Sequence, residues 1–590
     1  MVASASSELC SSFGSSLSDT RRLAFLPYDA LLGIVGYLSV QDVINLRKTC
    51  RHLHQFSKTR PVWAALASVI QHRRAIPLPQ WRTLESLDAQ ELESSVSQAA
   101  RIENNFLRER PFPRSVLQVI YTGRKWGQIS WLGQVCGGKY VIIFFRSGIL
   151  SVWDVTPEKS GCVATLQTGM DNYTHTCEVL QEEQATLIGL AAGAHDTDDD
   201  AEPGRYGVYR INFPPSNPGV TITQILDAKI DIPITGLFLD RGLAGVVGPF
   251  HNRKSAALQI YDWKTGHGIL LDTGIDLQTD CDLDVISFPE ELVLYAEDSK
   301  QSVLHTYTVE NIRRMLSLVE DHGPQTVARV GGGFAVNLDS EDSPSALDND
   351  ESSAPATMQI TLPPKRSKTR EIKDQGVGTF GAGYTMLKKS HMSARDRIPY
   401  GGKMSVLTMS LRQLEDHSSK VRCLTHHFLT PLASPASTPS SDSTTSTYLS
   451  ANSALSTPDD PLDGSPLKHT FAHTLGINSI VKGPTDYDLI SFGEGGTNVV
   501  WLARSDDTNL DSDDEDPEDI GNDESDKFEF TFYVATFPTS HARRRGEYVR
   551  RLKLPRIISP STTAALDLDD TQGVLCIATT HGEVFRLRFD

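Results

Sequence analysis

The chain has 590 residues and a formal net charge of −18. This length exceeds what one compact core usually supports, so we expect two or more structural units. Hydrophobic residues make up 39% and charged residues 22%, which is typical of a globular protein that carries some disordered insertions. The acidic balance argues against general binding of phosphate backbones, so nucleic acid is not an expected partner.

Eight cysteines are scattered singly along the chain, with no CxxC pair and no neighbouring His at zinc-ligand spacing. We therefore expect small buried thiols in a reducing compartment, and no metal site or cofactor. The Ser-rich N-terminal segment lacks the basic start and apolar run of a signal peptide, and no stretch is apolar enough to span a bilayer. The expected location is the cytoplasm, the nucleus or both, with no membrane partner.

Residues 1–20 are small and polar, which predicts a disordered tail. A dense helical block follows over residues 21–74. Pro27 suits the first turn of a helix, where a missing N–H costs little. Leu31, Ile34, Val35 and Leu38 recur at helical spacing, so they share one face of a first helix.

Two more helices are predicted in this block. Ser39 and Asp42 have the spacing of a capping box that begins the second helix, on which Val43, Leu46, Cys50 and Leu53 repeat. Pro61 opens the third helix, whose apolar side carries Val62, Trp63, Leu66, Val69 and Ile70. Three helices this short cannot bury their apolar stripes completely, so the block implies a docking partner.

Residues 75–115 are interpreted as a helical connector, because apolar residues recur in phase from Leu84 to Leu107. An ordinary first helix of the next domain is an equally good reading of this segment.

From Val116 to the end of the chain, short β-rich runs alternate with Gly, Pro, Asn and Asp clusters, which indicates an all-β domain over residues 116–590. LSVWDVTPEKSG and LQIYDWKTGHG are two copies of a recurring strand and turn, and such repeats are typical of propeller blades. Three low-complexity stretches predict disordered insertions near residues 339–357, 431–466 and 505–526.

The helical block resembles the F-box motif in the order, type and spacing of its residues. The matching residues are Leu26, Pro27, Leu31, Ile34, Val35, Tyr37, Leu38, Asp42, Val43, Leu46, Cys50, Leu53 and Trp63. Gly33 and Gly36 depart mildly from this pattern, because each weakens an isolated helix by about 1 kcal/mol relative to Ala.

The resemblance implies a function in protein ubiquitination. F-box proteins bind the small SKP-type adaptor of SCF-type (cullin-RING) ubiquitin ligase complexes, and through it the cullin, while a downstream domain captures a protein substrate for proteasomal degradation. The receptor itself makes and breaks no bonds. An F-box scaffold that binds the adaptor without directing degradation is the alternative.

The resemblance also implies roles for individual residues. The expected adaptor-binding residues, or their support, are Leu26, Pro27, Leu31, Ile34, Val35, Leu38 and Leu46. The residues expected to form the core of the module are Cys50, Leu53 and Trp63. The alternative is that all ten simply pack a small helical domain.

The β-rich region resembles a WD-repeat-type propeller of six to eight blades. Trp153-Asp154 resembles the WD dipeptide, and Tyr261-Asp262 with Lys264-Thr265-Gly266 resembles a blade end and its turn. A sandwich or barrel is the alternative. The predicted fold class is therefore α plus all-β: a small three-helix F-box module, a helical connector and a β-propeller-like domain.

No catalytic motif stands out. GVGTFG at Gly376–Gly381 matches a dinucleotide-binding pattern, but it follows a charged segment and no βαβ unit surrounds it. Arg543–Arg545 with Arg550 and Arg551 form a basic cluster that suits either a phosphopeptide-binding patch or a solvated loop. We therefore expect a non-catalytic interaction protein.

Overall fold

The computed structural model describes residues 26–330 and 489–590 apart from gaps, the longest at 193–203, 506–528 and 537–548, together with Leu23 and the strands 388–389, 404–413, 420–432 and 468–481. The predicted tail over 1–20 and the insertion near 339–357 lie outside the described residues. So do the insertions near 431–466 and 505–526, except where residues 431, 432 and 505 end strands.

The described part of the N-terminal block contains the helices α2 (Tyr28–Val35), α3 (Val40–Leu46), α4 (Arg51–Phe56) and α5 (Arg60–Gln71). The predicted capping box begins α3. The Asp42 backbone N–H donates to Ser39 Oγ at 3.1 Å, and the Ser39 N–H donates to Asp42 Oδ2 at 3.0 Å. Pro61 occupies the first turn of α5, as its missing N–H allows.

The second predicted helix is divided into α3 and α4. Cys50 has extended backbone angles, with φ −157° and ψ 164°, and it stands at the N-cap of α4. An extended residue ends the helical hydrogen-bond pattern, so a new helix starts at Arg51 in another direction. The helical spacing of Leu46 and Cys50 therefore does not place them on one helix.

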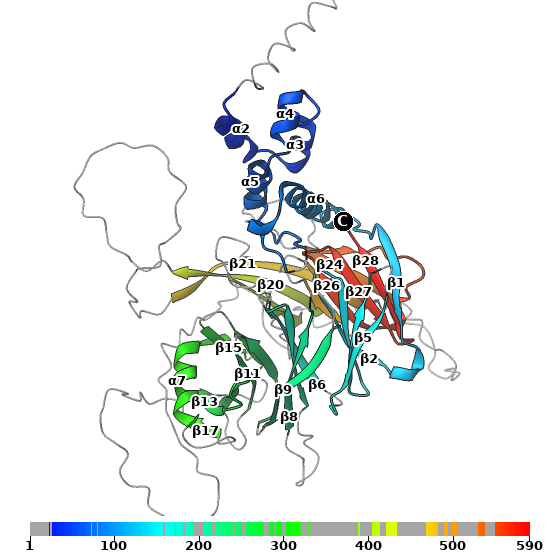
Figure 1. Cartoon of the computed structure of the whole chain (residues 1–590). Helices are drawn as coiled ribbons and strands as arrows, with labels where there is room; N and C mark the ends of the chain where they lie inside the picture. The colour runs from blue at the N-terminus through cyan, green and yellow to red at the C-terminus, as the bar shows by residue number, and fades with distance from the viewer. Residues whose placement is uncertain are drawn as a thin grey trace, which may run out of the picture.

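The connector is mainly the helix α6 (Ala89–Phe106), preceded by the short 3₁₀ helix η1 (Leu84–Ser86). Asp88 caps α6 by accepting the N–H groups of Gln90 and Glu91, both at 2.8 Å. The N-terminal half of α6 packs in the core of the helical module, and its C-terminal half packs in the core of a β-sheet. Figure 1 shows α6 between the two parts.

The described strands form seven sheets, which we number as blades in chain order. Blades 1 to 3 comprise β2 (Ile129–Val135), β3 (Tyr140–Phe145), β4 (Ile149–Asp154) and β5 (Gly161–Gln167); β6 (Tyr173–Leu180), β7 (Ala185–Ala192), β8 (Gly204–Asn212) and β9 (Thr221–Ile230); and β10 (Gly236–Asp240), β11 (Leu243–Pro249), β12 (Ser255–Asp262), β13 (Gly268–Asp276) and β17 (Val327–Val330).

The remaining blades follow the same antiparallel order within each sheet. Blades 4 to 7 comprise β14 (Asp282–Ser287), β15 (Glu291–Glu297) and β16 (Ser302–Thr308); β18 (Lys388–Lys389), β19 (Met404–Gln413), β20 (Lys420–Leu432) and β21 (Lys468–Val481); β22 (Ile490–Phe492), β23 (Asn498–Ser505), β24 (Glu529–Thr536) and β25 (Val549–Arg551); and β26 (Thr563–Asp569), β27 (Val574–Thr579), β28 (Glu583–Arg588) and β1 (Ser115–Tyr121).

The blades are arranged as in a β-propeller. The first strand of most blades contacts the first strand of a neighbour: β26 meets β2 and β22, and β10 meets β6 and β14. Blade 7 is completed by β1, which pairs antiparallel with β28 near the C-terminus although it starts the domain. The predicted fold class is thereby confirmed, and the seven sheets of the described chain fall within the six to eight predicted.

Blade 4 departs from the four-stranded pattern. The helix α7 (Val309–Glu320) follows β16, and its residues Ile312, Met315 and Leu316 are buried in the shared core of blades 3 and 4. The chain then adds β17 parallel to β13, as a fifth strand of blade 3. This helix was not predicted from the sequence.

The two sides of the propeller differ in what they contact. The turns β2–β3 and β26–β27 approach the helical module. Gln572 Nε2 in the β26–β27 turn donates to the Leu78 carbonyl at 3.1 Å, and Gly137 in the β2–β3 turn lies beside both residues. Since neighbouring strands are antiparallel, the turns β3–β4 and β27–β28 lie on the other side, which we call the remote side. Among the described residues, no helix has the length and apolar character needed to cross a membrane.

Candidate functional site

One face of α2 points outward. Ala30, Gly33 and Tyr37 follow one another at helical spacing and are exposed, and Tyr37 is 93% exposed at the end of the helix. A Cβ built on Gly33 meets no atom within 4 Å. Small residues flanked by a free aromatic ring leave a surface on which another protein can approach the helix backbone closely.

The structure divides the seven predicted adaptor-binding residues into three groups. Leu26 and Pro27 are exposed, and Ile34 is half-exposed on α2. Leu38 and Leu46 are half-buried and pack partly on the core of the module. Leu31 and Val35 lie four residues apart on the inward side of α2 and are buried, so of the two predicted roles, contact with the adaptor or support of its interface, their position suits support.

The predicted core residues also separate. Leu53 and Trp63 are buried in the module. Cys50 is exposed, so the prediction that it supports the module from within is wrong. The physical reason is the break between α3 and α4: the extended backbone of Cys50 leaves its side chain outside the helical stripe that points to the core.

Two residues that lie on the exposed surface were not predicted as site residues. Tyr37 belongs to the Tyr-Leu end of the motif, and its exposure is the signal that marks it. Tyr28 is 43% exposed, and its ring packs edge-on against Phe56 with the centroids 5.2 Å apart. The Tyr28 hydroxyl also bonds to the Thr59 hydroxyl at 3.0 Å, so this ring is held in place.

The charges on this part of the module are mixed. Lys48, Arg51, His52, His54 and Lys58 are exposed on and around α4, which gives a locally basic surface on an acidic chain.

Asp42 is the principal exposed acid at the start of α3. Hydrogen bonds from the Ser39 hydroxyl and the Ser39 backbone N–H lower the pKa of the Asp42 carboxyl, because they favour its charged form.

Arg47 fixes the module to α6. Its guanidinium donates Nη1 to Glu93 Oε1 at 2.7 Å and Nη2 to Glu93 Oε2 at 2.9 Å, while Nε donates to Ser57 Oγ at 3.0 Å. The same group lies over the ring of Trp63, 5.7 Å from its centroid. A bidentate, partly buried pair of this kind holds orientation better than an exposed ion pair does.

A second set of bonds fixes α6 to the propeller. Arg74 is buried, and it donates to the carbonyls of Ala99 on α6 at 3.0 Å and Asp570 in the β26–β27 turn at 2.8 Å. Asn105 Nδ2 donates to the carbonyls of Phe112 at 2.9 Å and Phe589 at 2.8 Å. Buried polar groups of this kind are costly when unpaired, so the contacts hold α6 in one place.

Apolar packing completes the junction. Ile102 covers Gly573, whose φ of +66° and close neighbour leave no room for a side chain. Phe106 stacks on Phe589 with the ring centroids 5.0 Å apart, and both rings are buried. The helical module and blade 7 are therefore connected by one continuous helix, α6, which is about 27 Å long at 1.5 Å per residue.

The two WD-like sequences occupy equivalent places in their blades. Asp154 ends β4, and its Oδ1 accepts the N–H of Thr156 at 2.9 Å. Asp262 ends β12, and its Oδ1 accepts the N–H of Lys264 at 2.8 Å. Each carboxylate thus stabilises the turn that follows the third strand of a blade. In the described part of the chain, no group of three or more His, Cys, Asp or Glu side chains is placed to hold a metal ion.

A comparison with known protein families identifies the helical module. Residues 23–65 match the family model described as the F-box domain, which spans α2, α3, α4 and the first half of α5. This module is an F-box, and the chain combines it with a propeller-like domain. No curated protein matches the chain.

Two solved structures are similar to the chain in fold. The β-propeller domain of Myceliophteria thermophila Cps50 (Swd1) is 10% identical, with a TM-score of 0.37, over 79% of this chain and 98% of that one. Chaetomium thermophilum Raptor is 11% identical, with a TM-score of 0.39, over 97% of this chain and 41% of that one. This chain thus spans less than half of that Raptor chain. The propeller-like fold rests on the strand pairing described above.

Proposed function

We propose that this chain is the substrate-recognition subunit of an SCF-type (cullin-RING) E3 ubiquitin ligase. F-box domains generally bind SKP-type adaptors, and an F-box joined to a propeller-like fold suggests an adaptor or receptor role in such complexes. The observation that carries the proposal is the apolar surface that the F-box exposes among the described residues: Tyr37 on the outward face of α2, with Leu26 and Tyr28 near the start of that helix. Exposed apolar groups that gather on one module mark an interaction site.

In this proposal the receptor acts by position alone. F-box and propeller domains are typically non-catalytic interaction modules. A client held on the propeller would be kept near the ubiquitin-charged enzyme, which raises its effective concentration there. The hydrogen bonds from α6 to both domains support this role, because they fix the F-box relative to the propeller and so keep a bound client at a set distance from the adaptor.

We further propose that the client binds on the remote side of the propeller. The opposite side carries the F-box and α6, whose contacts occupy the β26–β27 turn through Asp570 and Gln572. The remote side keeps its turns free of these contacts, and loops at one end of a rigid scaffold are common binding elements. A location in the cytoplasm or the nucleus, where such ligases act, is part of the same proposal.

Affinity purification of the intact protein, with ligase and proteasome activity blocked, tests the proposal. Recovery of an SKP-type adaptor together with a cullin is the expected result. Recovery of the adaptor alone would favour the alternative, an F-box scaffold that does not direct degradation. Failure to recover either subunit would contradict both.

A further inference from the structure

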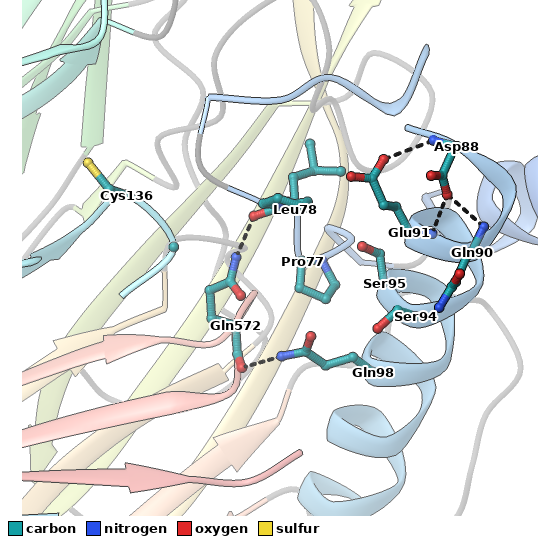
Figure 2. Close-up of a pocket in the computed structure, with 12 residues that line it drawn as sticks. Pro77, Leu78, Asp88, Gln90, Glu91, Ser94, Ser95, Gln98, Cys136 and Gln572 are labelled. Carbon is teal, nitrogen blue, oxygen red and sulfur yellow. Dashed lines mark hydrogen bonds between the residues drawn. The ribbon is translucent and has the colours of Figure 1, made fainter. Parts of the chain in front are cut away.

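A polar cavity of about 430 Å³ lies at the junction between the helical module and the propeller. One wall is the segment Pro77–Pro79, and the second is the N-terminal half of α6. The turn β2–β3, with Cys136 and Gly137, and Gln572 of the β26–β27 turn close the remaining side. Figure 2 shows the side chains of Glu91, Ser95 and Gln98 directed from α6 toward Pro77 and Leu78.

Ser95 is the unusual member of this lining. It is only 5% exposed, and its hydroxyl makes no hydrogen bond to any residue that the structure describes. A buried hydroxyl normally has a partner, and leaving one unpaired costs free energy. Figure 2 shows its hydroxyl directed into the cavity, so a group that enters the cavity can pair with it.

The charge of the lining selects the ligand. The lining contains two carboxylates, Asp88 and Glu91, and no Lys or Arg. Asp88 uses Oδ1 to cap α6, and Glu91 uses Oε2 to accept the Asp88 N–H at 2.9 Å and Arg82 Nη2 at 3.2 Å. The other oxygen of each carboxylate makes no hydrogen bond to a described residue. An anion would find no cation in the lining itself, and the neighbouring Arg82 is already paired with Glu91, whereas a cationic donor would find the remaining carboxylate oxygens as acceptors.

We propose that this cavity binds an arginine side chain of a partner protein. The aliphatic stem of the arginine would lie along Pro77, Leu78 and Pro79, as long basic side chains do on apolar surface. The guanidinium would reach the free oxygen of Glu91, and its remaining N–H groups would donate to the hydroxyl of Ser95 and the side-chain carbonyl of Gln98. Such a partner would touch the module and the propeller at once, and this role is independent of the proposed ligase function.

The test uses the full-length chain and two tripeptides with blocked ends, Gly-Arg-Gly and its citrulline counterpart, which keeps the shape and loses the charge. Binding is measured by ligand-observed NMR and calorimetry. The arginine peptide should bind with a Kd of about 1 mM or tighter, and the citrulline peptide about tenfold more weakly or less. No binding of the arginine peptide, or equal binding of both, would overturn the proposal.

Three variants locate the binding. Glu91→Gln removes the charge but keeps an oxygen that can accept the Asp88 N–H, so the cap of α6 is retained. Ser94→Trp, at an exposed position on the rim, fills the cavity from outside and serves if the first variant folds poorly. Each should weaken the arginine peptide about tenfold or more, while Glu103→Gln on the same helix, away from the cavity, should not change it. Equal affinity in all three variants would refute the site.

Discussion

Replacement of Tyr37 by Ala separates binding from folding. The side chain is 93% exposed, so its truncation removes almost no contact within the chain. Substitutions at such surface positions usually change the free energy of unfolding by less than about 0.5 kcal/mol. The variant should therefore unfold at nearly the same temperature as the wild type.

The effect on adaptor binding should be far larger. A tyrosine side chain buries roughly 150 Å² or more when it is fully covered, and at about 25 cal/mol per Å² this corresponds to about 4 kcal/mol. A ring covered on one side would contribute roughly half, about 2 kcal/mol. Because every 1.4 kcal/mol is about tenfold in affinity, Tyr37→Ala should weaken adaptor binding about thirtyfold.

The assay is calorimetric or interferometric titration of the full chain with purified SKP-type adaptor. Tyr121→Ala is the matched control, because Tyr121 is 67% exposed but lies on β1 of the propeller. The control should bind the adaptor as tightly as the wild type. If Tyr37→Ala binds within twofold of the wild type while folding normally, the exposed face of α2 is not the docking surface.

Three more changes probe the module and its junction. Gly33→Ala places a methyl group in open space, so it should stabilise α2 by up to about 1 kcal/mol, measured as a higher melting temperature, yet lower adaptor affinity; unchanged affinity would argue against close packing there. Gly573→Ala combines a positive φ with a clash against Ile102, so it should lower the free energy of unfolding, measured by urea denaturation, by roughly 1–3 kcal/mol. An unchanged free energy of unfolding would show that the packing around Gly573 can rearrange at little cost. Because the pKa of Asp42 is lowered in the folded chain, the stability that its charge contributes is complete above the ordinary pKa of 3.8 and is lost as the pH falls through the lowered pKa. The difference in unfolding free energy between the wild type and Asp42→Asn should therefore shrink below about pH 4. A difference that stays constant with pH would contradict the assigned role of the Asp42 charge.

Local signals in the sequence predicted much of the fold. The Ser39–Asp42 pair predicted the start of α3, and the Trp-Asp and Tyr-Asp pairs predicted blade ends, because capping and turn chemistry depend on residues close in sequence. The apolar period from Leu84 to Leu107 predicted α6 for the same reason.

What the sequence could not predict depends on longer-range contacts. The exposure of Cys50 follows from a break in the backbone that helical spacing alone does not reveal. The helix α7 and the pairing of β17 with β13 depend on which blade offers an open edge, and periodicity carries no such information. The cavity at the junction is likewise built from turns more than four hundred residues apart, Cys136 and Gln572.

The two readings of α6, a connector between modules or the first helix of the next domain, prove compatible once its contacts are known. Leu92 and Val96 lie in the core of the F-box, whereas Ile102 and Phe106 lie in the core of blades 6 and 7. A helix whose two halves complete different cores cannot rotate without exposing apolar surface on one side or the other, which costs about 25 cal/mol per Å². Buried Arg74 adds a polar penalty to the same motion, because it donates to carbonyls on both parts. The orientation of the exposed face of α2 relative to the propeller is therefore set by packing within the chain.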